Sequence, residues 1–150
     1  MTVKRLLILA MLAVPAFAAT RGTPAEAKAM MTKAVEHYQK VGRKQALADF
    51  NGGKAWKDRD VYVWCADPDG IIKANAGFPN LIGASANTWK DSNGKPVGKA
   101  TWEIASKKGS GSLEYRWFNP VTGKMEPKVT FFQKVADDLV CGSGAYNPPR

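Results

Sequence analysis

The chain has 150 residues, of which 45% are hydrophobic and 23% are charged, and this length and balance predict one folded globular domain. Two cysteines and one histidine are too few for a disulfide-dense scaffold, a thiolate zinc site or a histidine-rich metal cluster. The formal net charge of +9 favours anionic partners, but the basic residues are scattered, which is typical of a solvated surface rather than of a nucleic-acid site.

The first 18 residues have the pattern of a secretory signal peptide. A short basic segment precedes an apolar run at 6–14, and small residues follow up to Ala18, where we expect cleavage. The apolar run is shorter than the roughly 20 residues of a transmembrane helix. Removal of two of the 22 basic residues leaves 20 against 13 acidic ones, so the mature domain, 19–150, carries a charge of +7. We therefore expect a periplasmic or secreted protein.

The N-terminal third of the mature chain predicts two helices. Thr23 is a typical N-cap, Pro24 suits the first helical position, and Glu26 completes a capping box. Apolar residues then recur at spacings of three and four as far as Gly42, which ends the helix. A second, shorter helix is expected over 44–50.

The period of the sequence changes after residue 60. β-Branched and aromatic residues predict a strand over 61–66, and a type I turn at 67–70 leads into a second strand at 71–75. The segment 77–96 has turn chemistry throughout, and 97–107 predicts a helix. Three further strands are expected at 112–118, 128–135 and 139–146. This order predicts an α+β domain on one antiparallel sheet.

The sequence contains no complete catalytic or cofactor-binding motif. No Gly-Lys pair is followed by Ser or Thr, so there is no phosphate-binding loop. The aspartate-rich segments 67–70 and 91–94 lack the bidentate Glu of a calcium loop and are expected to be turns. His37 has no nucleophile placed near it and is expected to be a partly exposed helix residue. We therefore expect no catalysis, no metal and no cofactor.

The two cysteines, Cys65 and Cys141, lie in the middle of the first and the last predicted strand. Outside the cytoplasm, two thiols that lie close together normally oxidise. A bridge is feasible if the two strands are neighbours. The residues alone leave this open against two buried small apolar side chains. Neither cysteine begins a helix, so a redox-active pair is not expected.

A set of aromatic and cationic residues recurs along the predicted strands. Rings exclude water, and a cation then meets an anion in a medium of low dielectric constant, as a pocket for a small carboxylate requires. Composition alone favours the alternative, in which the rings are core and the cations are surface. The candidate ligand-binding residues of this set are Tyr62, Trp64, Tyr115, Arg116, Trp117 and Lys128.

Several segments, in order, resemble the single Cache domains of bacteria. They are FNGG at 50–53, KDRDVYV at 57–63, DPDG at 67–70, ANAG at 74–77, LIG at 81–83, EYRW at 114–117, NPVTGK at 119–124 and PK at 127–128. The resemblance runs from about residue 25 to 146, nearly the whole mature chain. Most Cache domains are attached to membrane receptors, whereas this chain resembles the free-standing secreted type.

The resemblance implies a PAS-like, profilin-like fold. A long N-terminal helix lies behind a five-stranded antiparallel sheet of order 2-1-5-4-3, with a helical crossover on the other face. In that order the first and last strands are neighbours, which favours a bridge between Cys65 and Cys141. Cache domains sense small extracellular ligands, commonly carboxylates, amino acids or other metabolites. The implied partners are a small organic anion and a membrane receptor or transporter, with no nucleic acid.

The resemblance also implies residue roles. Lys128 matches the Pro-Lys position and is the expected carboxylate partner, Tyr115 and Trp117 wall the pocket, and Trp64 forms its floor. Phe131, also a candidate site residue, stands where the family usually has tyrosine, although strand alternation sends it and Lys128 to opposite faces unless a bulge intervenes. The sequence thus predicts a periplasmic domain that binds a small organic anion without catalysis. The alternative is a basic envelope-surface or adhesive protein that binds polyanions.

Overall fold

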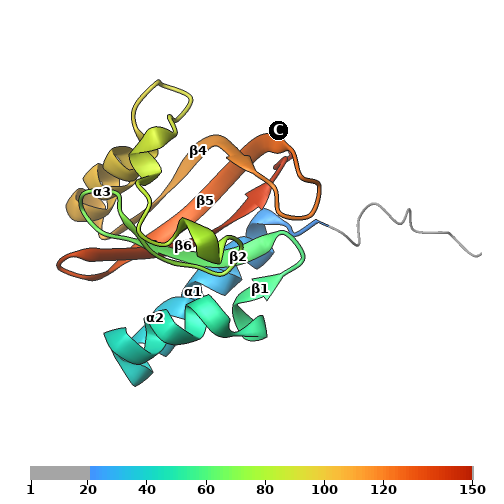
Figure 1. The fold of residues 1–150 in the computed structure, drawn as a ribbon. Coiled ribbons are helices and arrows are strands. Elements are labelled where there is room, and N and C mark those ends of the chain that lie inside the picture. Colours follow the sequence, from blue (N-terminus) through green and yellow to red (C-terminus); the bar gives the residue numbers. More distant parts are fainter. Residues whose placement is uncertain (1–20, 150) are drawn as a thin grey trace, which may run out of the picture.

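The computed structural model describes residues 21–149, so the predicted signal peptide at 1–18 lies outside the described residues. Figure 1 shows an antiparallel sheet between two layers of helix. Helices α1 (Pro24–Val41) and α2 (Arg43–Gly52) lie on one face, and α3 (Val97–Lys108) lies on the other. The expected α+β architecture is therefore confirmed.

Helix α1 begins at the predicted capping box. The hydroxyl of Thr23 accepts a hydrogen bond from the N–H of Glu26, and the Glu26 carboxylate accepts one from the N–H of Thr23. Because these bonds satisfy two donors that a helix leaves free, the start of α1 is well defined. The helix ends at Gly42, whose φ of 82° lies in the left-handed region that glycine adopts without strain.

The sheet contains the five predicted strands in the predicted order, together with one short additional strand. In the sheet, β2 and β6 are central, β5 and β4 follow β6, and β1 and β3 pair with successive parts of the other edge of β2. The two residues of β1 are exposed and polar. A strand this short has no periodic pattern of apolar residues, so the sequence does not predict it. The strands are β1 (Lys57–Asp58), β2 (Val61–Ala66), β3 (Ile72–Asn75), β4 (Ser110–Phe118), β5 (Met125–Ala136) and β6 (Leu139–Tyr146).

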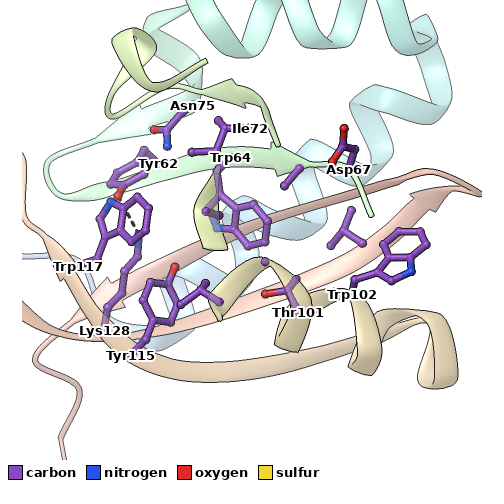
Figure 2. A pocket seen from close by; sticks show the side chains of 15 residues that line it. Tyr62, Trp64, Asp67, Ile72, Asn75, Thr101, Trp102, Tyr115, Trp117 and Lys128 are labelled. Atoms are coloured by element: carbon purple, nitrogen blue, oxygen red, sulfur yellow. Dashed lines mark hydrogen bonds between the residues drawn. The ribbon is translucent and has the colours of Figure 1, made fainter. Parts of the chain in front are cut away.

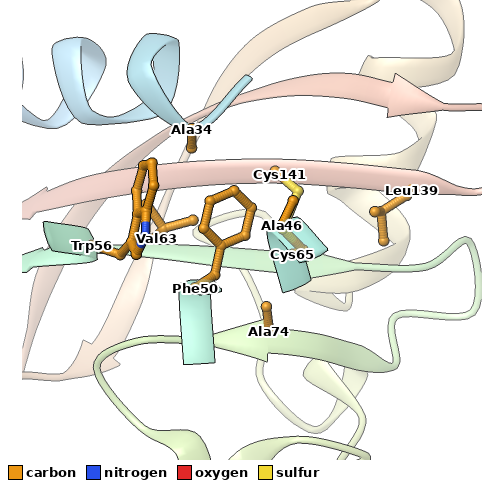
Figure 3. Packing of buried hydrophobic residues seen from close by; sticks show 9 residues of the cluster. All are labelled: Ala34, Ala46, Phe50, Trp56, Val63, Cys65, Ala74, Leu139 and Cys141. Carbon is orange, nitrogen blue, oxygen red and sulfur yellow. A yellow bond between two sulfur atoms is a disulfide. The ribbon is translucent and has the colours of Figure 1, made fainter. Parts of the chain in front are cut away.

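The face of the sheet under α1 and α2 holds a closely packed apolar core (Figure 3). Phe50 and Trp56 meet edge to face with their ring centroids 4.8 Å apart. Cys65 and Cys141 lie directly opposite each other on β2 and β6 and form a disulfide bond, so the bridged alternative is confirmed. The buried residues of this cluster are Ala34, Ala46, Phe50, Trp56, Val63, Cys65, Ala74, Leu139 and Cys141.

Candidate functional site

A cavity of about 30 Å³ lies on the opposite face of the sheet, between the strands and α3 (Figure 2). Residues of β2 to β6 form its floor and walls, and α3 and the crossover at 77–96 contribute the remaining side. A space of this size admits a group of only a few non-hydrogen atoms unless its walls move. The cavity is therefore narrow in this conformation.

Two glycines of β6 make room for the side chains that line the cavity. An ideal Cβ on Gly142 would lie 2.7 Å from the Trp64 ring, and one on Gly144 would lie 2.6 Å from Cε of Lys128. Distances this short do not occur between carbon atoms that are not bonded to each other, so no other residue fits at either position without displacing its neighbours. The glycines of the last strand thus permit the close approach that strand glycines usually indicate.

Lys128 of β5 is 2% exposed and reaches into the cavity from its floor. Its Nζ donates a hydrogen bond of 2.9 Å to the hydroxyl of Tyr62 and lies 4.1 Å from the centroid of that ring. The ring of Tyr146 is on another side, 4.9 Å from Nζ. Burial lowers the pKa of Lys128 to about 7, and the negative charge of Asp60 partly opposes this shift.

The hydroxyl of Tyr62 continues into a chain of hydrogen bonds. It lies 2.8 Å from the hydroxyl of Tyr146, which donates a bond of 2.7 Å to the carbonyl oxygen of Phe118. Because a carbonyl oxygen can only accept, the Tyr146 proton is committed to Phe118, and Tyr62 must donate to Tyr146. The oxygen of Tyr62 therefore acts as an acceptor toward Lys128. Burial raises the pKa of both phenols, which keeps them protonated.

The remaining walls are aromatic. Tyr115 and Trp117 of β4 meet edge to face at 5.7 Å between centroids, and Trp117 packs against Trp89 of the crossover at 4.3 Å. Trp64 donates from Nε1 to the hydroxyl of Thr130 at 3.0 Å, which fixes the orientation of its ring. Figure 2 shows the hydroxyl of Tyr115 directed into the cavity. The walls are thus held by contacts among themselves.

Five of the seven expected site residues line this cavity, and two do not. On β4 the side chains alternate, so Arg116 is exposed between buried Tyr115 and Trp117, and it donates to the carbonyl of Met125. Phe131 packs on the α1 face, because the irregularity in β5 lies beyond it, after Lys134. Arg116 and Phe131 therefore lie outside this cavity, because side chains alternate along both strands. The residues that line the cavity as expected are Tyr62, Trp64, Tyr115, Trp117 and Lys128.

Sequence reasoning missed the lining residues that come from other elements. Asn75 ends β3, and its Oδ1 accepts from the N–H groups of Gly77 and Phe78, which shapes the start of the crossover. Thr101 and Trp102 of α3 cover the end of the cavity farthest from Lys128 (Figure 2). The quoted ANAG segment contains Asn75, and Thr101 shares one side of the helix predicted at 97–107 with the apolar residues Val97 and Ala105. For Trp102 the sequence carried no comparable signal.

A second polar cluster lies beside the tyrosines, at the entry to α1. Asp60 is fully buried and accepts from the N–H of Gly22 at 2.6 Å and from Nδ2 of Asn119 at 3.1 Å. Glu126 accepts from Asn119 and from both terminal nitrogens of Arg21. The Arg21 hydrogen bonds lower the pKa of Glu126 to about 2. Both carboxylates are therefore occupied by donors outside the cavity.

The sheet, the long helix behind it and the ring-lined cavity in front define a PAS-like sensor domain. The family described as Single Cache domain 2 matches residues 9–147, and the chain belongs to this family. Cache domains are extracytoplasmic sensor domains that bind small-molecule ligands. Among the described residues, no helix is both long enough and apolar enough to cross a membrane.

Solved structures share this fold. A methyl-accepting chemotaxis protein from Vibrio parahaemolyticus has a TM-score of 0.67 and 27% identity, over 81% of this chain and 86% of that one. A periplasmic sensor domain of a chemotaxis protein has a TM-score of 0.67 and 23% identity, over 89% and 99%. A Cache chemosensory domain, described for its recognition of carboxylic acids, has a TM-score of 0.60 and 25% identity, over 82% and 87%.

Proposed function

We propose that this domain binds a short organic carboxylate in the cavity, beside Lys128, in the periplasm and without chemical change. The observation that carries the proposal is a buried amino group that forms no ion pair with any carboxylate among residues 21–149. Proteins rarely bury a lysine in this way, because desolvation of its charge is costly unless an anion compensates for it. A ligand carboxylate would supply that anion.

The other lining groups support a small and largely apolar ligand. Lys128 and the hydroxyl of Tyr115 offer donors for the two oxygens of one carboxylate, and the faces of Trp64 and Trp117 offer contacts for a short hydrocarbon tail. A cavity of about 30 Å³ has no room for a long tail. Larger acids would require the crossover to move together with Trp89, which packs on Trp117.

Two features support the periplasm as the compartment. The disulfide between Cys65 and Cys141 is of a kind that persists in oxidising compartments and is rare in the cytosol. The segment 1–18 has the signal-peptide pattern described above. A membrane receptor or transporter that responds to the loaded domain remains part of the proposal.

The polyanion-binding alternative has less support. Arg21, Arg43, Arg59, Lys73, Lys95 and Lys134 each pair with a carboxylate, which reduces the free positive charge of the surface. A heparin affinity that falls steeply between about 50 and 300 mM salt would favour the polyanion-binding alternative. The fall should be on the order of the loss expected when several counterions are released. Binding of a small acid in the cavity depends far less on salt.

Isothermal titration with formate, acetate and propionate at pH 6.5 tests the proposal. We expect the wild type to bind at least one of these acids. Lys128→Met should weaken that binding roughly 10- to 100-fold, the range for a lost hydrogen bond to a charged group. The matched control is Lys134→Met, which removes a lysine from the same strand outside the cavity. Equal affinities for the wild type and Lys128→Met, with both folded by thermal melting, would remove Lys128 from the site.

A further inference from the structure

The side chains in contact with Nζ of Lys128 carry no charge. Tyr62 comes from β2, Tyr146 from β6, and Tyr115 and Trp117 from β4. Helix α3 contributes Thr101 and Trp102 at the far end of the cavity, together with the apolar Val97. The rings nearest to the amine are thus phenols, and the rest of the cavity is lined by uncharged aromatic, hydroxyl and hydrocarbon groups apart from Asp67 at its opposite end.

The nearest acidic groups are turned to other partners. Asp60 is occupied by Gly22 and Asn119, and Glu126 is occupied by Arg21 and Asn119. Asp67, at the opposite end of the cavity, accepts from the N–H groups of Asp69 and Ile71 and pairs with Lys73 at 3.1 Å. Of these acids, Asp60 is the one whose negative charge raises the pKa of Lys128, and it does so through space. Residues 21–149 therefore provide no counter-ion in contact with Nζ.

The hydrogen bonds around Nζ suit an amine better than an ammonium group. An ammonium group has three N–H donors to satisfy. Among residues 21–149, one oxygen accepts a hydrogen bond from this group, that of Tyr62, whose own proton is committed to Tyr146. A neutral amine donates to the same oxygen and leaves fewer donors unsatisfied in the cavity. The pKa of about 7 for this group agrees with that balance.

We propose that the cavity takes up one proton from solvent with each carboxylate that it binds, and that Nζ of Lys128 holds this proton. This inference rests on the proposed function and deepens it. The free site contains R–NH₂, and the loaded site contains R–NH₃⁺ beside the ligand's carboxylate. One N–H bond forms, no bond to carbon changes, and the net charge of the cavity is zero before and after binding. The domain thus responds to a weak acid and to acidity together.

The inference predicts a particular pH dependence. Well above pH 7, affinity for acetate should fall about tenfold per pH unit, because binding consumes one proton and the proton concentration falls tenfold per unit. Below about pH 6 the lysine is already protonated in the free domain, so affinity should become constant until acetate itself is protonated. A site with a permanently charged lysine would show no such decline between pH 7 and 9.

Titration of acetate at pH 8, in several buffers that differ in ionisation enthalpy, counts the protons directly. The slope of observed heat against buffer ionisation enthalpy should approach one proton taken up per acetate at pH 8 and should fall below about 0.3 at pH 6. Lys134→Met should keep both slopes, and Lys128→Arg, which stays charged, should bind with a slope near zero. Wild-type binding with a slope near zero at pH 8 overturns proton uptake and leaves carboxylate binding intact.

A second measurement does not depend on the ligand. In the domain labelled with ¹³C at lysine Cε, the resonance absent from Lys128→Met should titrate near pH 7 in the free protein and well above pH 8 with saturating acetate. A free-state titration above pH 9 overturns the inference by itself. Failure of acetate to bind at any pH overturns both this inference and the proposal that the domain binds acetate. The titration of Lys128 in the free protein does not require ligand, so it tests the proton-uptake inference separately from the proposed function.

Discussion

The two faces of the central sheet are built on opposite principles, although the same strands supply both. Along β2, Val63 and Cys65 face α1 and join an apolar core with a disulfide, whereas Tyr62 and Trp64 face the cavity and hold their polar ends in hydrogen bonds. The first face is stabilised by packing and a covalent link. The second is held open by ordered side chains, so stability and ligand recognition should respond to different substitutions.

The largest effect should follow removal of the disulfide on the α1 face. The bond closes a loop with a sequence separation of 76 residues, and chain-entropy reasoning assigns about 4 kcal/mol to a loop of this length. We expect Cys65→Ala/Cys141→Ala to lose roughly that free energy of unfolding, measured by urea denaturation. The wild type in reductant should match the variant. A loss below about 1 kcal/mol would mean that the apolar packing alone holds β2 to β6.

On the cavity face, the largest expected effect is a pH dependence. The pKa of Lys128 is about 7 in the folded state and near its ordinary value of 10.5 in the unfolded chain. Between these values the unfolded state binds more protons, so this lysine makes the free energy of unfolding rise with pH, by up to about 1.4 kcal/mol per unit. Below pH 7 both states hold the proton and the contribution is constant.

Urea denaturation from pH 6 to 9 should show this rise in the wild type and not in Lys128→Met. We also expect the variant to be more stable than the wild type at pH 6, since an uncompensated buried charge is removed. The difference should narrow as the pH rises. A difference that stays constant from pH 6 to 9 would show that Lys128 remains charged throughout, and the proton-uptake inference would lose its basis.

A smaller effect is expected at the glycines of β6. In Gly144→Ala the new methyl group would lie 2.6 Å from the carbonyl oxygen of Val129, which is backbone and cannot move aside freely. Overpacking of this kind costs about 1–3 kcal/mol. The control is Gly52→Ala near the end of α2, where a Cβ has no neighbour within 4 Å. It should change stability by less than about 0.5 kcal/mol, and equal effects at both sites would refute a steric role for Gly144.

The smallest effect concerns a polar atom on the apolar face. The hydroxyl of Ser143 is the one buried side-chain oxygen or nitrogen without a hydrogen-bond partner among residues 21–149. Loss of an unsatisfied buried hydroxyl should stabilise the domain, so Ser143→Ala should raise the free energy of unfolding by about 1 kcal/mol. Thr130→Val serves as the contrast, because that hydroxyl has two partners and its loss should destabilise. A destabilised Ser143→Ala would indicate a partner, such as an ordered water.

The sequence predicted the order and type of the elements because those signals are local or carried by family motifs. The capping box at Thr23 and Glu26 and the turn at 67–70 depend only on neighbouring residues, and both elements formed where expected. The strand order came from the resemblance. The two-residue strand β1 escaped detection because its residues carry no pattern of their own.

The site was harder to predict because neighbours in the sequence of a strand lie on opposite faces of the sheet. Arg116 stands between two lining residues and therefore points the other way, and Phe131 is an odd number of positions from Lys128. The contributions of Asn75 and Trp102 depend on how the crossover and α3 fold back over the sheet, which no local pattern encodes. The hydroxyl chain from Tyr62 to Phe118 joins three strands and becomes visible only in the assembled sheet.

The disulfide has one more consequence, for the alignment of β6 itself. Its Gly142-Ser143-Gly144 stretch has little side chain to distinguish one face from the other, and glycine-rich strands are prone to slip along their partners. A slip of one residue would turn Cys141 toward the rings and Gly142 toward α1, closing the space that Trp64 and Lys128 now occupy. A covalent link between two residues that face each other forbids that shift. The crosslink on one side of the sheet thus fixes the register of the cavity-lining residues on the other.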